Sequence, residues 1–214
     1  MNVLLIGANG QIGKHLIELF QESNEHTVRA MVRKNEQAEA LKKSGVESVV
    51  ADLEGSVDGI AEAAKDSDAV IFTAGSGGST GADKTILVDL DGAVKSMEAA
   101  QQAGAKRFII VSAHQAHNRE NWSEQIKYYY AAKHYADRML EASDLDYTIV
   151  RPGGLLNEAG NGKISAAENL ERGSISREDV ARTVFAALNM KNTYKRSFDL
   201  ISGEKSINDA LKTI

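Results

Sequence analysis

The chain has 214 residues, 43% of them hydrophobic and 26% charged, with a formal net charge of −5 and no cysteine. This length predicts one domain with a sizeable core, and the mild negative charge argues against a nucleic acid partner. The absence of cysteine excludes disulfides and thiolate catalysis. No apolar run approaches the roughly 20 residues that span a bilayer, and no charged leader begins the chain. We therefore expect a soluble, cytoplasmic protein that binds no membrane.

Apolar, β-branched runs alternate with helical patterns along the chain. The predicted strands cover residues 3–6, 27–32, 46–50, 69–72, 108–111, 147–150 and 198–201. The predicted helices lie near 11–22, 35–43, 57–65, 84–103, 124–143 and 177–189. Short strands that are apolar throughout and separated by helices indicate a parallel sheet covered on both faces. Right-handed crossovers then predict a doubly wound α/β fold of about seven strands, in a single domain over 1–214.

A glycine-rich turn joins the first predicted strand to the first predicted helix. Such a turn lets the free N–H groups and the positive dipole end of the helix approach a pyrophosphate. Two residues separate each pair of glycines, which departs from the usual G-x-G-x-x-G spacing, so a tight turn without a ligand stays open as the alternative. The predicted dinucleotide contacts here are Gly7, Asn9, Gly10, Gln11, Ile12 and Gly13.

The end of the second predicted strand carries two cations, Arg33 and Lys34, where NAD-specific sites usually carry an acidic residue. An arginine fork suits the 2′-phosphate of NADP(H). The sequence therefore favours NADP(H) as cofactor, with NAD(H) as the alternative. The alternative is that Arg33 and Lys34 bind no ligand and are solvated at the start of a helix, with Glu36 as their partner.

Polar and small residues follow the next two predicted strands. Asp52 and Leu53 come after the third, where a carboxylate and a backbone N–H can contact an adenine edge. The tract 75–81 contains four glycines and follows the fourth strand. It lies at the carboxyl edge of the sheet, where ligands bind in such folds, although a plain flexible loop would have the same composition.

Taken together, these motifs resemble the short-chain dehydrogenase/reductase superfamily over essentially the whole chain. The resemblance rests on the glycine turn, on one residue pair after each of the third and fourth strands, on a serine after the fifth, and on a Tyr-x-x-x-Lys pair. The residues beyond the turn are Asp52-Leu53, Ala74-Gly75, Ser112, Tyr129 and Lys133.

Two further segments point to the atypical branch of that superfamily, namely Arg151-Pro152-Gly153 and residues 175–181. This branch includes small proteins similar to NAD-dependent epimerase/dehydratases, to NmrA-like proteins and to biliverdin-reductase-B-like proteins. The resemblance implies an NAD(P)-binding Rossmann fold. It also implies that Ala74, Gly75, Lys133, Pro152 and Gly153 contact the cofactor.

The resemblance implies a catalytic role for three residues. Tyr129 and Lys133 are four apart on a predicted helix and share a face, and a nearby ammonium lowers the pKa of a phenol. By resemblance, Tyr129 passes a proton to or from a substrate oxygen while hydride moves at the nicotinamide, and Ser112 hydrogen-bonds that oxygen. Lys133 also holds the nicotinamide ribose. The alternative is that the tyrosine run 128–130 only packs or lies at the surface.

The substrate is not readable from the sequence. Residues 153–176 form a short polar segment, which predicts a small cap or a mobile lid rather than a large substrate lobe. We expect an NADP(H)-dependent oxidoreductase acting on a small carbonyl or alcohol substrate. The alternatives are a non-catalytic NADP(H) sensor of the NmrA-like kind, an epimerase or dehydratase, and a flavin or tetrapyrrole reductase.

Our expectations about metal binding and oligomeric state rest on weaker sequence signals. His114 and His117 are three apart but lack an obvious third ligand, so we expect no metal and assign them to a substrate loop or the surface. Ser176 and Asp179 fit the start of the last predicted helix, a structural role. We expect a monomer or a weak homodimer that binds a small-molecule substrate.

Overall fold

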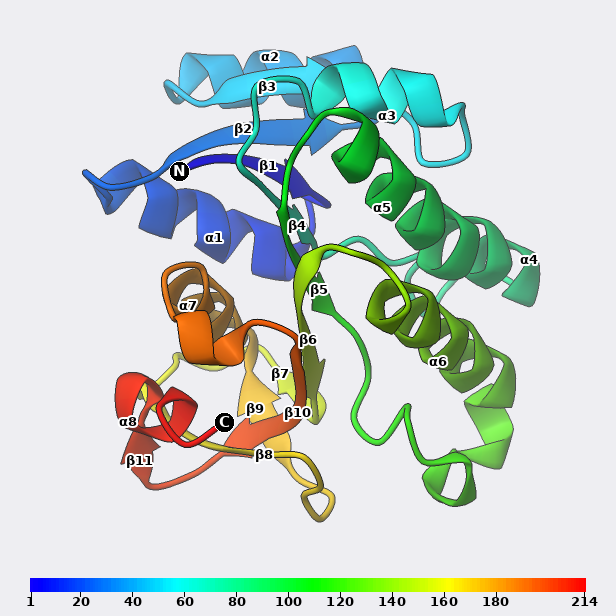
Figure 1. Cartoon of the computed structure of the whole chain (residues 1–214), viewed down its shortest axis with the longest axis vertical. Helices are drawn as coiled ribbons and strands as arrows, with labels where there is room; N and C mark the ends of the chain where they lie inside the picture. Colours follow the sequence, from blue (N-terminus) through cyan, green and yellow to red (C-terminus); the bar gives the residue numbers. More distant parts are fainter.

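The computed structural model describes residues 1–214, and a nine-stranded sheet runs through its centre (Figure 1). The seven parallel strands are β1 (Asn2–Ile6), β2 (Thr27–Val32), β3 (Glu47–Val50), β4 (Ala69–Phe72), β5 (Arg107–Val111), β6 (Asp146–Pro152) and β10 (Arg196–Ser202). Two short strands, β8 (Lys163–Ala167) and β11 (Lys205–Ser206), extend the β10 edge through antiparallel pairings. The full order is β11-β8-β10-β6-β5-β4-β1-β2-β3.

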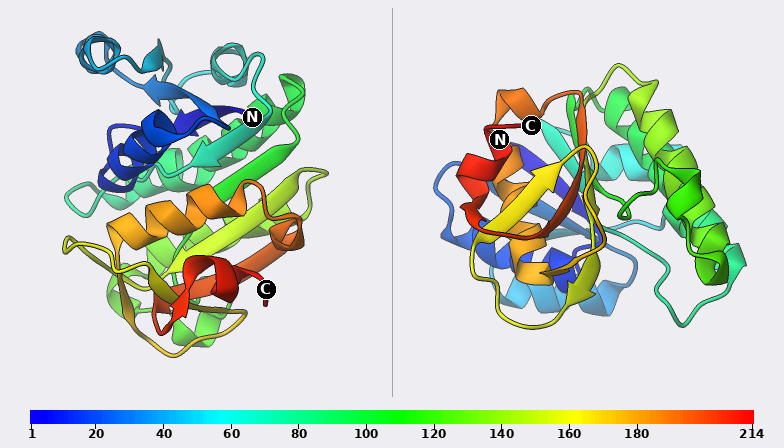
Figure 2. Two further views of the ribbon diagram at one scale, coloured as in Figure 1. Left: turned by 90° about the vertical axis from the view of Figure 1, so that its left-hand side faces the viewer. Right: turned by 90° about the horizontal axis from the view of Figure 1, so that it is seen from below.

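Helices cover both faces of the sheet, which confirms the doubly wound arrangement (Figure 2). One face carries α1 (Gln11–Glu22), α2 (Asn35–Lys43), α7 (Arg177–Ala187) and α8 (Ile207–Leu211), and the other carries α3 (Val57–Ala63), α5 (Gly92–Gln102) and α6 (Lys127–Glu141). Successive residues of a strand point to opposite faces, so Val3 and Leu5 enter one apolar core while Leu4 and Ile6 enter the other. Two-sided burial explains why these strands are apolar throughout.

The segment from the end of β6 to the start of α7 holds secondary structure that the sequence pattern does not predict. Strands β7 (Gly154–Leu156) and β9 (Ser174–Ser176) form a separate parallel pair, while β8 joins the main sheet. All three residues of β7 are exposed, and Ile164 alone is buried in β8. These strands therefore lack the buried apolar run that signals a strand in sequence.

A π-helix interrupts the predicted helix 84–103. The structure has α4 (Ala82–Lys84), the π-helix η1 (Thr85–Asp91) and then α5. Three 3₁₀ segments, η2 (Arg119–Asn121), η3 (Glu124–Ile126) and η4 (Lys191–Thr193), complete the helical elements, so α6 begins three residues later than predicted. π-Helical turns of this kind are frequent at functional sites, and η1 faces α6 directly.

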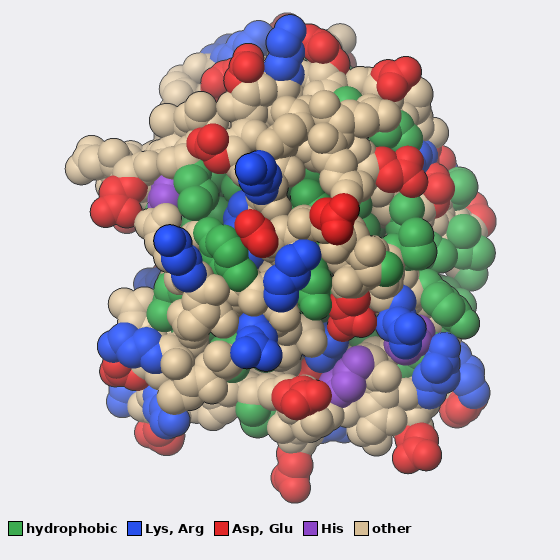
Figure 3. Space-filling model, in the orientation of Figure 1, with side chains coloured by type: hydrophobic (Ala, Val, Ile, Leu, Met, Phe, Trp, Pro, Cys, Tyr) green, Lys and Arg blue, Asp and Glu red, His purple; other side chains and the backbone are tan.

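At the surface, acidic and basic side chains are interspersed over the face seen in Figure 3, with apolar groups between them. That face carries no extended patch of one charge. None of the helices combines the length and the apolar character that crossing a bilayer requires.

Candidate functional site

A cavity of about 410 Å³ lies at the carboxyl ends of β1, β2, β3 and β4. The strand order turns back at β1, which lies between β2 and β4, so this is the switch point where doubly wound folds bind ligands. Eight of the predicted cofactor residues line the cavity: Gly7, Asn9, Gly10, Arg33, Asp52, Leu53, Ala74 and Gly75. Six further polar residues also line it, two of them from the tract 75–81: Gln37, Glu54, Thr73, Ser76, Thr80 and Lys84.

The glycine turn packs so tightly that two of its glycines are required by the fold. Gly7 has φ +91°, and a Cβ there would lie 2.6 Å from the backbone nitrogen of Ala74. A Cβ on Gly13 would overlap the carbonyl oxygen of Gly7. A Cβ on Gly10 would lie 3.1 Å from that same oxygen, the only atom within 4 Å. Gly10 therefore faces open space at the cavity wall, while Gly7 and Gly13 hold the turn against its neighbours.

Helix α1 begins at this turn with free backbone donors. Gly10 is its N-cap and supplies no side-chain acceptor, and the N–H groups of Gln11 and Ile12 make no hydrogen bond within the chain. Free amides and the positive end of the helix dipole suit a phosphate. The turn therefore fits the pyrophosphate of a dinucleotide, although the side chain of Ile12 is buried and Gln11 does not line the cavity.

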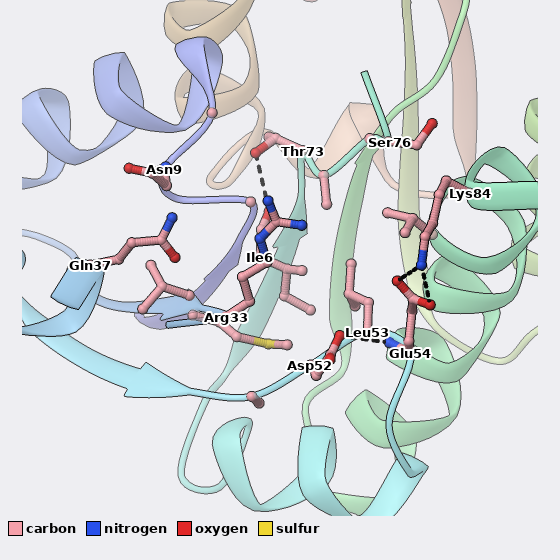
Figure 4. A pocket seen from close by; sticks show the side chains of 18 of the residues that line it. Ile6, Asn9, Arg33, Gln37, Asp52, Leu53, Glu54, Thr73, Ser76 and Lys84 are labelled. Carbon is pink, nitrogen blue, oxygen red and sulfur yellow. Dashed lines mark hydrogen bonds and ion pairs between the residues drawn. The ribbon is translucent and has the colours of Figure 1, made fainter. Parts of the chain in front are cut away.

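Arg33 is directed into the cavity from the end of β2 (Figure 4). Its guanidinium makes no hydrogen bond or ion pair within the chain, so the predicted alternative of a partner at Glu36 is absent from the structure. Lys34 is exposed, caps α2 and does not line the cavity. Of the two cations, Arg33 alone is therefore placed to meet a cofactor phosphate.

The opposite wall is formed by the loop after β3. The carboxylate of Asp52 accepts a hydrogen bond of 3.0 Å from the Glu54 backbone N–H, which fixes the loop. Glu54 in turn accepts from Lys84 at 2.7 Å through both oxygens, and this contact raises the pKa of Lys84. Glu54 and Lys84 are 30 residues apart, so no local sequence signal predicts the pair (Figure 4).

Lys133 of α6 is buried against Asp89 of the π-helix. Lys133 Nζ lies 3.3 Å from Asp89 Oδ1, and both side chains are at most 3% exposed. Asp89 Oδ2 accepts a hydrogen bond of 2.9 Å from the Ser76 backbone N–H in the cavity wall. Burial alone would lower the pKa of Lys133, but the effects of Tyr129 and Asp89 raise it above its ordinary value. Asp89 is the site residue that sequence reasoning missed most clearly.

Tyr129 lies on the same face of α6, with Lys133 Nζ 5.8 Å from the centre of its ring. Burial raises the pKa of Tyr129, and Lys133 offsets only part of that rise. Lys133 does lower the phenol pKa, as expected, but burial and the Asp89 carboxylate raise it by more, so the net shift is upward. The phenol is neutral at pH 7.

Ser112 follows β5 and is 4% exposed, and its hydroxyl lies beside the Asp137 carboxylate, an interaction that lowers the pKa of Asp137. Behind it, Asp137 of α6 pairs with Arg151 of β6 at 3.3 Å, and all three side chains are buried. Burial raises the pKa of Asp137 to about 6, although Arg151 opposes the rise. Asp137 and Arg151 thus form a buried ion pair that packs beside Ser112 at the end of β5.

The remaining predicted cofactor residues lie at the end of β6, away from the cavity lining. Pro152 is buried, and its carbonyl accepts a hydrogen bond of 3.1 Å from the His114 backbone N–H. A Cβ on Gly153 would overlap the carbonyl oxygen of Gly173. Gly153 is therefore required for close packing of the 173–176 segment, whether or not a cofactor contacts it.

The two remaining predictions concern the start of α7 and the histidines 114 and 117. The Ser176 hydroxyl accepts from the Asp179 backbone N–H at 3.0 Å, which confirms the helix cap. His117 Nε2 lies 2.7 Å from Asn169 Oδ1, while His114 is buried and lines a second cavity. No group of three His, Cys, Asp or Glu side chains could hold a metal ion.

Fold and cavity together define a doubly wound dinucleotide-binding protein. The profile of a family described as NAD(P)H-binding matches residues 7–191, and the chain belongs to this family. A Bacillus subtilis (strain 168) protein named as an uncharacterized sugar epimerase, YhfK, is 64% identical over 214 residues and the whole of both chains. A solved structure from Bacillus halodurans, described as a candidate NAD-dependent epimerase/dehydratase, has 39% identity, full coverage of both chains and a TM-score of 0.93.

A relative with a named activity is also similar. ChuY, described as an anaerobilin reductase from Escherichia coli O157:H7, has 27% identity and a TM-score of 0.83 over 96% of this chain and 99% of its own. The chain is thus one of an NAD(P)-binding family of oxidoreductase-like and epimerase-like proteins.

Proposed function

We propose that this protein is an NADP(H)-dependent reductase of small carbonyl compounds. The observation that carries the cofactor choice is Arg33, an unpaired guanidinium directed into the cavity from a strand end that has no carboxylate. A 2′-phosphate would accept two charge-assisted hydrogen bonds from this guanidinium. The ribose of NAD(H) offers no such anion.

Tyr129 supports reduction as the direction of the reaction. When bound, NADPH supplies a hydride from its nicotinamide. The substrate oxygen then needs a proton, and the half-buried Tyr129 phenol, whose pKa is raised, holds one at neutral pH. Oxidation of an alcohol, the first step of a hydride-based epimerisation, would instead need the phenolate. A phenol with a raised pKa is suited to donate the proton of a reduction.

Ser112 and Lys133 have supporting roles in this proposal. The Ser112 hydroxyl, at the end of β5 and beside Asp137, would hydrogen-bond the carbonyl oxygen of a substrate. Lys133 is held by Asp89, which also accepts from the Ser76 backbone N–H in the cavity wall, and its ammonium would hold the nicotinamide ribose. The Lys133–Asp89 pair keeps the local charge near zero, which is consistent with a neutral Tyr129.

The test follows NADPH oxidation with a panel of aldehydes, quinones and flavins. Tyr129→Phe should reduce turnover by ~10²–10⁴, the usual contribution of a positioned acid or base, and leave NADPH affinity unchanged. Tyr128→Phe is the matched control, because Tyr128 is 45% exposed. Full turnover in Tyr129→Phe would remove its role as proton donor. Tight NADPH binding without oxidation by any panel member would favour the sensor alternative.

A further inference from the structure

A second cavity, of about 490 Å³, lies beyond the carboxyl end of β5. Residues 114–121 form one wall and residues 169–172 the other, and Tyr130 of α6 also lines the space. Ser112 and Tyr129 do not line the cavity, but the ring centre of Tyr130 lies 6.0 Å from that of Tyr129. The cavity is therefore next to Tyr129, and its volume suits a small organic molecule.

Gln115 ties the two walls together. Its backbone has φ +58°, a conformation that is uncommon outside glycine and is often found at functional sites. Its side-chain amide donates to Asp199 Oδ2 at 2.5 Å and accepts from Asn121 at 2.8 Å. Asp199 also accepts from the Leu170 backbone N–H at 3.1 Å. The hydrogen-bonding groups of Gln115 and Asp199 are consumed in building the walls.

The groups that remain available around the cavity are mainly donors. His114 is 9% exposed, and neither of its ring nitrogens has a hydrogen-bond partner. Buried polar groups are nearly always paired, so this ring lacks a partner that a ligand can supply. The side-chain oxygens of Asn118 and Asn169 are engaged within the chain, which leaves their amide nitrogens free.

Arg172 adds a cation at the rim. Its guanidinium donates to the Asn121 carbonyl at 3.3 Å and has no carboxylate partner. Its exposed neighbour Glu171 is the only carboxylate that lines the cavity. His114 Nδ1 lies 3.9 Å from the buried Asp199 Oδ2. Donors and an unpaired guanidinium together match an oxygen-bearing anion.

We propose that this cavity is the substrate pocket of the reductase and selects carbonyl compounds that carry a carboxylate. Arg172 and His114 are then the specificity-determining residues, and they act on substrate affinity rather than on cofactor binding. This inference rests on the proposed reductase function, but the predicted preference of the pocket for a carboxylate can be measured by ligand binding, without turnover.

The experiment compares 4-formylbenzoate with its methyl ester, because the two share ring and aldehyde and differ in the charge. Wild type should reduce the acid with a kcat/KM at least about tenfold higher, on the scale of one charge-assisted hydrogen bond. Arg172→Gln and His114→Gln should each bring the ratio close to one, chiefly through KM, with the NADPH Kd unchanged. Arg196→Gln, an exposed arginine outside both cavities, is the control.

A binding measurement separates this inference from the reductase function. Calorimetric titration of the NADP⁺-loaded protein with 4-(hydroxymethyl)benzoate and with its methyl ester should show the same preference for the acid. If neither aldehyde is reduced but this preference exists and is lost in Arg172→Gln, the pocket stands and the reductase function fails. Equal binding of acid and ester, or a preference that survives in Arg172→Gln and His114→Gln, would overturn the pocket assignment.

Discussion

Lys133 Nζ of α6 lies 3.3 Å from Asp89 Oδ1 of the π-helix, in surroundings from which water is almost excluded. The pair joins the predicted Tyr-x-x-x-Lys helix to the loop that lines the dinucleotide cavity, because Asp89 also accepts from the Ser76 backbone N–H. A lysine held in this way is a fixed part of the wall. Its ammonium is compensated locally and does not dominate the ionisation of Tyr129.

Removing one partner of this pair should destabilise the protein strongly. Asp89→Asn leaves a buried ammonium without a counter-charge, and such changes typically cost about 3–5 kcal/mol. The double variant Asp89→Asn/Lys133→Met should cost less than the sum of the two single changes. Urea unfolding of the four proteins measures the coupling. Lys212→Ala, which removes an exposed pair with Asp209, should leave the free energy of unfolding nearly unchanged. Additive costs would contradict the pairing.

The two glycines of the turn should respond differently to substitution. Gly13→Ala places a Cβ into the Gly7 carbonyl, so we expect a loss of about 1–3 kcal/mol in stability, typical of overpacking. Gly10→Val extends toward the cavity, so we expect the fold to be retained and NADP(H) binding to be lost. Thermal unfolding and nucleotide fluorescence titration distinguish these outcomes. A Gly10→Val protein with wild-type affinity would exclude the turn from the cofactor site.

Arg33 should determine the choice of cofactor. Arg33→Ala removes the only cation at the end of β2 that is directed into the cavity, and charged hydrogen bonds contribute about 1.5–3 kcal/mol. NADP(H) affinity should fall roughly ten- to a hundredfold, while NAD(H) affinity hardly changes. Lys34→Ala, next in the chain but outside the cavity lining, is the matched control. Calorimetric titration measures both nucleotides. Equal losses for NADP(H) and NAD(H) would show that Arg33 does not read the 2′-phosphate.

Asp137 should make stability depend on pH between about 4 and 6. Burial raises its pKa from 3.8 to about 6, so across this range the folded state holds a proton that the unfolded state has released. Stability should therefore fall as pH rises through this window, by roughly 3 kcal/mol in all, and then level off. Denaturant unfolding at several pH values measures this fall, and Asp137→Asn should remove that part of the slope. Identical slopes in the two proteins would contradict a raised pKa in the folded state.

The parallel sheet was predictable because each of its strands is buried on both faces. All five residues of β5 are buried, for example, so the apolar run marks the strand without help from its neighbours. The short strands β7 and β8 carry no such run. Their pairings depend on contacts with β9 and β10, far along the chain. Local composition describes a polar segment there and does not indicate which strand it joins.

Some residues of the candidate site could be predicted from the sequence and others could not. The glycine turn and Arg33 are readable because their position relative to a strand end fixes their role. Asp89 is not readable, because its contact with Lys133 depends on a π-helix inside a segment whose pattern predicts a regular α-helix. Tyr129 illustrates a third case. Its spacing from Lys133 is visible in the sequence, but the direction of its pKa depends on burial, which only the packed structure supplies.

A crystal structure of the protein with NADP⁺ tests the central claim most directly. The account predicts the pyrophosphate at the 7–13 turn, the 2′-phosphate within hydrogen-bond distance of the Arg33 guanidinium, and the nicotinamide directed toward Ser112 and Tyr129. A nucleotide bound with its 2′-phosphate away from Arg33, or with its nicotinamide turned away from those two hydroxyls, would contradict it.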